Sequence, residues 1–208
     1  MRLIGVTGGV GAGKSSILSY IQKHYKCRIY LADEVAHLVK EKGENCYKHL
    51  VELLGEEVLE SESGQIDKKK MAAMIFQDEE LLEKVNDIVH PEVRIYLEKR
   101  VEEAKNNPEI ELLFIEAALL IEAGYKDMVD EMWYIYAEES VRRKRLKESR
   151  GYTDEKISQI MEAQLSEEEF RSGCDFVIDN SGSLRKSYKQ IKNKLEAFTW
   201  LEGRKNRN

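Results

Sequence analysis

Short apolar runs along this chain alternate with segments in which apolar residues recur every three or four positions. The apolar runs are typical of buried strands, and they predict five of them, at residues 3–6, 28–31, 112–116, 132–135 and 175–179. Helical spacing follows the first run, with Ile17, Leu18 and Ile21 on one face. Strands that alternate with helices indicate a mainly parallel sheet with helices on both faces. We therefore expect a three-layer α/β fold.

Two long segments interrupt this alternation. Residues 34–107 have helical spacing throughout, and we expect His90-Pro91 to interrupt the helix there, because proline disfavours helical conformation in the residue before it. A basic helix and a second helix that begins at Asp154 follow the fourth strand. We expect a single domain that consists of a core (residues 1–33, 108–137 and 174–208), a helical insertion (34–107) and a helical lid (138–173).

Composition narrows the possible classes of function. The chain has 208 residues, of which 42% are hydrophobic and 35% charged, and its formal net charge is −6. This is typical of a soluble globular protein and argues against a general nucleic-acid binder. No apolar run approaches the roughly 18 residues of a membrane span, and no leader segment is evident. We expect a cytoplasmic protein with no membrane or nucleic-acid partner, whose three widely spaced cysteines are reduced.

The first predicted strand leads into a glycine-rich stretch. Its residues match the phosphate-binding pattern Gly-x4-Gly-Lys-Ser/Thr; they are Gly8, Gly9, Val10, Gly11, Ala12, Gly13, Lys14 and Ser15. In such a P-loop, backbone N–H groups surround phosphate oxygens and the following helix adds its positive N-terminal end. We expect Lys14 to reach the β- and γ-phosphates and Ser15 to bind Mg²⁺. The structural alternative is a glycine-rich turn that only caps a helix.

Two carboxylates, Asp33 and Glu116, lie at the C-terminal ends of predicted strands. In open parallel sheets this edge is where ligands bind. Beside a P-loop, such a pair suits Mg²⁺-assisted phosphoryl transfer, with Glu116 near the metal and Asp33 near the acceptor hydroxyl. For Asp33 the structural alternative is a helix N-cap.

The basic helix at residues 141–150 carries several arginines in an otherwise acidic chain. They are Arg142, Arg143, Arg145 and Arg150. Charge of this density usually forms a solvated helix face. A triphosphate, however, needs neutralising charge, so we expect some of these arginines to belong to a lid that closes over the transferred phosphate.

Several segments, taken in order, resemble the dephospho-CoA kinase family of P-loop kinases. The similarity is carried by residues 4–16, 32–33, 89–94, 119–124 and 176–182, so it spans nearly the whole chain. It implies ATP-dependent phosphorylation of the ribose 3′-hydroxyl of dephospho-CoA, with Mg²⁺, by a P-loop NTPase fold with a helical CoA-binding region and a lid. The family usually has Asp in place of Glu116, and Pro-Leu-Leu-Phe-Glu in place of Ala-Leu-Leu-Ile-Glu at residues 118–122.

The resemblance also implies roles for individual residues. Asp33 falls at the position of the family's proposed general base, which favours catalysis over N-capping. ATP contacts extend from the P-loop through Ser16, with Asn180 and Gly182 on the adenine side. The acceptor is assigned to His90, Arg94 and Glu122, although a helix-boundary or hydrogen-bonded polar histidine is the alternative for His90.

Two other functions fit parts of the sequence. The same P-loop would serve another small-acceptor kinase, for a nucleoside, a nucleotide or shikimate. A GTP-dependent switch would need Asn-Lys-x-Asp after a strand, but the nearest match, at residues 193–196, ends in Glu and lies within the last predicted helix. Monomer and weak homo-oligomer both stay open.

Overall fold

The computed structural model describes residues 1–76 and 78–205 of the chain. The chain forms two compact units, which we treat separately. The sheet unit comprises Met1–Ile29 and Glu109–Asn208, and the helical unit comprises Tyr30–Pro108.

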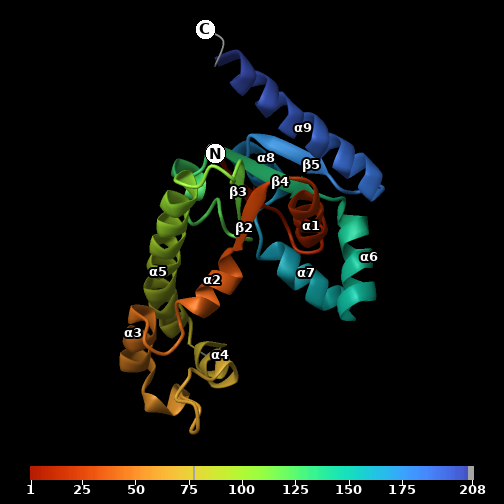
Figure 1. Ribbon diagram of the computed structural model, residues 1–208. Coiled ribbons are helices and arrows are strands. Elements are labelled where there is room, and N and C mark those ends of the chain that lie inside the picture. The colour runs from red at the N-terminus through yellow and green to blue at the C-terminus, as the bar shows by residue number, and fades with distance from the viewer. Residues whose placement is uncertain (77, 206–208) are drawn as a thin grey trace. The chain divides into compact units, whose positions relative to one another are not determined.

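A parallel sheet forms the centre of the sheet unit, with strand order β2-β3-β1-β4-β5 (Figure 1). Its strands are β1 (Arg2–Thr7), β2 (Cys27–Leu31), β3 (Leu112–Glu116), β4 (Glu131–Tyr136) and β5 (Phe176–Asp179). All five predicted strands are confirmed, each within one residue of its expected bounds. The pairings of β1 with β3, β1 with β4, and β4 with β5 are parallel.

The strand order explains why the segment after β1 is suited to bind a ligand. The consecutive strands β3 and β4 lie on opposite sides of β1, so the chain changes direction across the sheet at this point. Such a switch opens a crevice at the carboxyl ends of the strands. Both faces of the central strands are covered, since the consecutive residues Met132 and Trp133 of β4 point to opposite faces and neither has exposed surface. The loop that follows β1 is therefore supported by a buried core.

Helices of the sheet unit follow the predicted alternation. They are α1 (Lys14–His24), η2 (Tyr125–Asp127), α6 (Glu139–Arg150), α7 (Asp154–Glu162), α8 (Glu167–Gly173) and α9 (Leu184–Lys205). Helix α1 buries Ile17, Leu18 and Ile21, as its spacing predicts. Its Tyr20 stacks on Tyr188 of α9 at a ring-centroid distance of 3.8 Å. These contacts hold α1, and with it the preceding loop, against the sheet unit.

The helical unit is organised around one long helix, α5 (Glu79–Lys105). The other elements are α2 (Ala32–Leu38), α3 (Asn45–Leu54), η1 (Glu56–Val58) and α4 (Lys68–Phe76). Helix α5 buries a valine and leucine stripe and contacts α2, α3 and α4. The unit thus has a small core of its own, built from facing helix stripes.

The expected interruption at His90-Pro91 is wrong, because α5 continues through Pro91. Proline inside a helix removes one hydrogen bond and costs about 3 kcal/mol. Here Pro91 is exposed, while Val89 and Val93 on either side of it are buried. Packing of the buried stripe on both sides of the proline offsets the lost bond.

The cysteines are free thiols, as expected. Burial raises the pKa of Cys46 to about 11 and the pKa of Cys174 to about 12, so both thiols are protonated at neutral pH. Within residues 1–76 and 78–205, no helix has both the length and the apolar character needed to cross a membrane.

Candidate active site

The loop between β1 and α1 has the backbone shape that its glycines predict. Gly8 has φ 148°, and a Cβ atom there would lie 2.5 Å from the carbonyl oxygen of Ile135 on β4. Gly13, the N-cap of α1, is left-handed with φ 92°. Only glycine adopts these conformations without strain. Thr7, the last residue of β1 before the loop, is buried, and its hydroxyl donates to the carbonyl oxygen of Ala118 at 3.1 Å.

Lys14 and Glu116 come together at the ends of α1 and β3. The Lys14 ammonium group donates to the carbonyl oxygen of Gly8 at 2.7 Å and lies 3.5 Å from Oε1 of Glu116. Their side chains are 16% and 15% exposed, so this charge pair is largely withdrawn from solvent. Electrostatic interactions are stronger in such a setting than in bulk water. The structure therefore places a cation and an anion beside the loop, as the sequence predicts.

Two of the four candidate arginines contact the loop directly. Nε of Arg142 donates to the carbonyl oxygen of Val10 at 2.9 Å. A Cβ atom at Gly9 would lie 2.5 Å from the Arg142 guanidinium, so the absence of a side chain at Gly9 makes room for it. Arg145 donates to the carbonyl oxygens of Gly11 and Ala12 at 3.4 and 3.2 Å. Helix α6 is thus anchored beside the loop (Figure 1).

The other two arginines bond elsewhere. Arg143 donates to Glu139 at 2.7 Å and to the hydroxyl of Ser158 at 3.0 Å, which joins α6 to α7. Arg150 ends α6, and its guanidinium lies 5.9 Å from the ring centroid of Tyr152. The sequence pattern does not distinguish the arginines that contact the loop from those that bond elsewhere. The contacts in the folded chain distinguish them.

Asn180 is buried and its amide is engaged within the protein. Its Nδ2 donates to the carbonyl oxygen of Ala12 at 2.8 Å, and its Oδ1 accepts from the Ser187 hydroxyl at 2.8 Å. The backbone carbonyl of Asn180 accepts from Arg145 at 2.8 Å. Asn180 therefore holds the loop from the β5 side. Gly182 follows two residues later in the turn before α9.

Gln164 is a contact residue that the sequence does not reveal. Its Oε1 accepts the backbone N–H of Val10 at 3.0 Å and the Arg142 guanidinium at 3.2 Å. One side-chain oxygen thus joins the segment between α7 and α8 to both α6 and the P-loop. The bond to Val10 spans 154 residues, and no local motif marks a partner so distant.

Replacing Gln164 with leucine is expected to weaken ATP binding. The substitution removes an acceptor that orients Val10 and Arg142, and the loss of such a bond costs about 1 kcal/mol. We expect the dissociation constant for ATP to rise roughly fivefold, as measured by isothermal titration. Gln159→Leu, an exposed position on α7, is the matched control. Equal ATP affinity in both variants would contradict this prediction.

Residues predicted for the acceptor lie in both units. In the helical unit, Asp33 is exposed in the first turn of α2, whose N-cap is Leu31, so the N-cap alternative for Asp33 is wrong. His90 is exposed on α5, and Arg94 donates to Glu98 at 2.9 Å on the same helix. Glu122 is exposed in the sheet unit, in the segment after β3.

Comparison with known proteins decides the family. A family model described as dephospho-CoA kinase matches residues 2–186. This chain belongs to the dephospho-CoA kinase family. Its relatives include the dephospho-CoA kinase of Carboxydothermus hydrogenoformans, 33% identical over 97% of both chains. The dephospho-CoA kinase of Aquifex aeolicus is 35% identical over 96% of this chain and 98% of its own.

Solved structures agree with the fold of a dephospho-CoA kinase. The protein TT1252 of Thermus thermophilus has a TM-score of 0.76 and 28% identity, covering 94% of this chain and 97% of its own. The dephospho-CoA kinase of Campylobacter jejuni has a TM-score of 0.69 and 20% identity, with coverage of 94% and 96%. A shikimate kinase of Acinetobacter baumannii, with a TM-score of 0.55 and 11% identity over 95% and 94%, shares the fold alone.

Proposed function

We propose that this chain transfers the γ-phosphate of ATP to the ribose 3′-hydroxyl of dephospho-CoA, which yields coenzyme A and ADP. The observation that carries this proposal is the family match over residues 2–186, which spans both the P-loop and the helical unit. A P-loop alone would support any ATP-dependent kinase.

On the donor side, the backbone N–H groups of residues 8–13 would surround the phosphates of ATP. In the presence of ATP, Lys14 would donate to the β- and γ-phosphates instead of to the Gly8 carbonyl oxygen. Its ammonium group would then neutralise charge that develops in the transition state. Arg142 and Arg145 are the two lid arginines that we assign to this side, because they already contact the loop. Well-placed arginines contribute up to roughly 10³- to 10⁵-fold in phosphoryl transfer.

The residues at the loop fit a bound Mg²⁺ ion. Ser15 in the first turn of α1 and Glu116 at the end of β3 supply oxygen donors, which Mg²⁺ prefers. Mg²⁺ in kinases needs only one or two protein oxygens beside water and phosphate, so this small set is sufficient. When bound, the ion would neutralise charge on the β- and γ-phosphate oxygens. Glu116 has the same carboxylate as the aspartate that is usual in the family, on a side chain one methylene longer.

On the acceptor side, Asp33 would accept the proton of the 3′-hydroxyl and orient its oxygen for in-line attack. Its exposure leaves the carboxylate accessible to a substrate. His90, Arg94 and Glu122 would contact dephospho-CoA, and Gly182 with the backbone near Asn180 would contact adenine. We infer a cytoplasmic enzyme, which the composition supports.

The test is mass-spectrometric detection of coenzyme A after incubation of the protein with ATP and dephospho-CoA. Adenosine, AMP and shikimate serve as control acceptors. We expect coenzyme A and ADP in equal amounts, and no comparable product from the controls. Product from a control acceptor, with none from dephospho-CoA, would overturn the proposed substrate.

A GTP-dependent switch has less support. The nearest match to a guanine-reading motif, residues 193–196, lies inside α9, where Leu195 is buried. A base-reading motif needs an accessible loop after a strand. Nucleotide titration tests this alternative, and we expect ATP to bind more tightly than GTP.

A further inference from the structure

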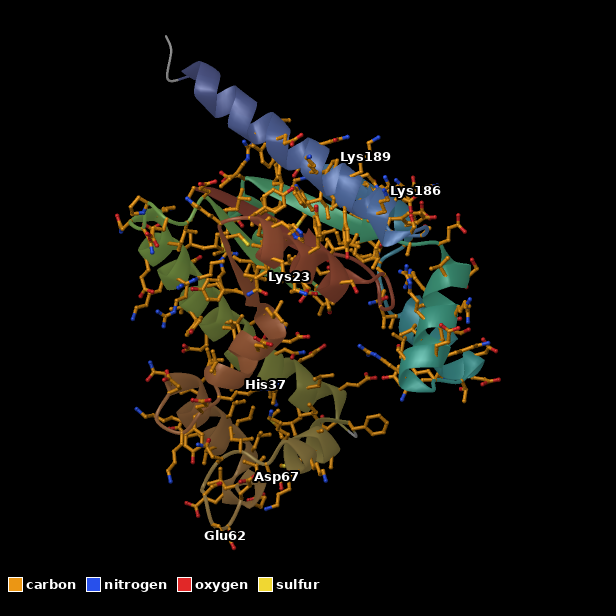
Figure 2. The ribbon with its side chains drawn as sticks, turned by 45° about the vertical axis from the view of Figure 1, so that its right-hand side comes forward. Lys23, His37, Glu62, Asp67, Lys186 and Lys189 are labelled. Carbon is orange, nitrogen blue, oxygen red and sulfur yellow. The ribbon has the colours of Figure 1, made fainter. Side chains whose placement is uncertain are left out.

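Ser187 is a buried polar residue to which the proposed function gives no role. It lies near the N-terminal end of α9 and has no exposed surface, whereas its neighbours Lys186 and Lys189, labelled in Figure 2, are exposed. In the described part of the chain, the other buried polar side chains are those of Thr7, which directly precedes the P-loop, and Asn180, which contacts it. Burial of a hydroxyl is unfavourable unless it is hydrogen-bonded. The partners of Ser187 therefore indicate what it does.

The hydroxyl of Ser187 bonds outside its own helix. Serine inside a helix commonly donates to the carbonyl four residues earlier. Oγ of Ser187 instead lies 2.8 Å from Oδ1 of Asn180 and 3.1 Å from the carbonyl oxygen of Asp179. The Asp179 carbonyl has a second donor, Nε2 of Gln190 at 2.9 Å, but no described residue other than Ser187 donates to Oδ1 of Asn180. Loss of the hydroxyl would therefore leave Asn180 with an unpaired buried oxygen.

The chemistry of the Asn180 side chain fixes the direction of its bonds. A carboxamide has one donating nitrogen and one accepting oxygen. The nitrogen faces the carbonyl oxygen of Ala12, which can only accept, so the amide oxygen faces Ser187 and needs a donor there. Gly13 makes room for this contact, because a Cβ atom at Gly13 would lie 2.4 Å from Nδ2 of Asn180. A series of hydrogen bonds thus runs from α9 through Asn180 to the P-loop.

The direction of the Ala12 carbonyl sets the direction of the next backbone N–H. The peptide bond between Ala12 and Gly13 is trans, and in a trans peptide unit the C=O and N–H bonds point in opposite directions. The Ala12 carbonyl faces Asn180 and Arg145, so the N–H of Gly13 faces the opposite way. Among the described residues, no acceptor is paired with this N–H. It is therefore available to a phosphate oxygen.

We propose that Ser187 is a positioning residue for ATP binding. It holds the amide of Asn180, which in turn holds the carbonyl of Ala12. The Ala12 carbonyl then directs the N–H of Gly13 toward the phosphates. The inference rests on the donor side of the proposed function and adds to it a residue of α9 that does not touch the nucleotide.

The physical basis of this role is preorganisation of the loop. A loop that already has its bound shape binds its ligand more tightly than one that must be ordered on binding. Without the Ser187 hydroxyl, the Asn180 amide would turn toward another donor and release Ala12. The free loop would then populate arrangements that do not bind phosphate, and the apparent affinity falls in proportion to the competent fraction.

The test compares the full chain with its Ser187→Ala variant. By isothermal titration, we expect the dissociation constant for ATP to rise roughly tenfold. In steady-state kinetics, KM for ATP is expected to rise with it, while kcat and KM for dephospho-CoA stay within about twofold of wild type, because saturating ATP restores the loop. Equal ATP affinity in Ser187→Ala and wild type would overturn the proposal.

Ile191→Val separates this role from a general loss of stability. Ile191 lies four residues further along α9 and has no exposed surface, and its apolar side chain takes no part in the hydrogen bonds to the loop. We expect both Ile191→Val and Ser187→Ala to lower the melting temperature by about 2–4 °C, as measured by circular dichroism. Only Ser187→Ala is expected to weaken ATP binding. An equal loss of ATP affinity in both variants would make the role of Ser187 purely structural and reject the proposal.

A double-mutant cycle tests whether Ser187 acts through Asn180. Asn180→Ala is expected to weaken ATP binding at least as much as Ser187→Ala, because it removes the bond to Ala12 itself. The double variant is expected to bind ATP as Asn180→Ala does, because Ser187 then has no link to the loop. If the two losses are additive, Ser187 acts independently of Asn180 and the proposal is wrong.

The proposed function has a separate readout. Formation of coenzyme A by the wild type, together with equal ATP affinity in wild type and Ser187→Ala, would reject only the role of Ser187. Absence of coenzyme A from the wild-type reaction would reject the proposed acceptor. Titration with ATP needs no acceptor, so it tests Ser187 in either case.

Discussion

Lys14→Ala is expected to abolish phosphoryl transfer. The ammonium group is the cation at the mouth of the P-loop, held by the Gly8 carbonyl at 2.7 Å and 3.5 Å from Glu116. Its removal leaves the developing charge on the transferred phosphate without its nearest cation from the loop. Losses of such stabilisation at buried sites reach several kcal/mol, so we expect kcat to fall by at least roughly 10³-fold. Coenzyme A formation, followed by mass spectrometry, measures the effect.

Lys23→Ala is the matched control for this experiment. Lys23 lies on the same helix, is exposed, and is labelled in Figure 2. The substitution changes the net charge equally, so a general effect of charge would appear in both variants. Normal turnover by Lys14→Ala would refute the assignment of the loop as the phosphate site.

Asp33→Asn is expected to lower kcat by roughly 10²- to 10⁴-fold and to leave ATP affinity nearly unchanged. Asparagine keeps the shape of the side chain but cannot accept the proton of the acceptor hydroxyl. Asp33 does not cap α2, so the structural cost is limited to the interaction of one first-turn carboxylate with the helix dipole, about 0.3–1 kcal/mol. Steady-state kinetics with dephospho-CoA and titration with ATP separate the two effects.

Glu34→Gln tests whether the effect is specific to Asp33. Glu34 is the next residue of the same helical turn, is also exposed, and loses the same charge. A general weakening of α2 would affect both variants equally. Equal turnover in Asp33→Asn and wild type would refute a catalytic role for Asp33 and make it an ordinary surface carboxylate in the first turn of α2.

Local chemistry made most of the fold predictable. The strands are short apolar runs, of which β1, β3 and β4 are largely buried, and the P-loop follows from glycines whose positive φ angles other residues avoid. The exception is Pro91. The conformational preference of proline predicts that the helix is interrupted at this residue. The buried positions on both sides of Pro91 pack against other helices and keep α5 continuous. Tertiary packing outweighs a single unfavourable residue when the flanking stripe is long enough.

The sequence by itself determined the fold class, the P-loop and the family, because each depends on residues close together in the chain or on their order along it. Only the tertiary structure decided which arginines contact the loop. Arg142 and Arg145 reach it across more than 130 residues, while Arg143 bonds within the α6–α7 pair. The sequence does not tell which of the four arginines on α6 contact the loop. The orientation of α6 in the folded unit decides this. Gln164 is identified in the same way, since a bond between distant residues forms only once the chain is folded.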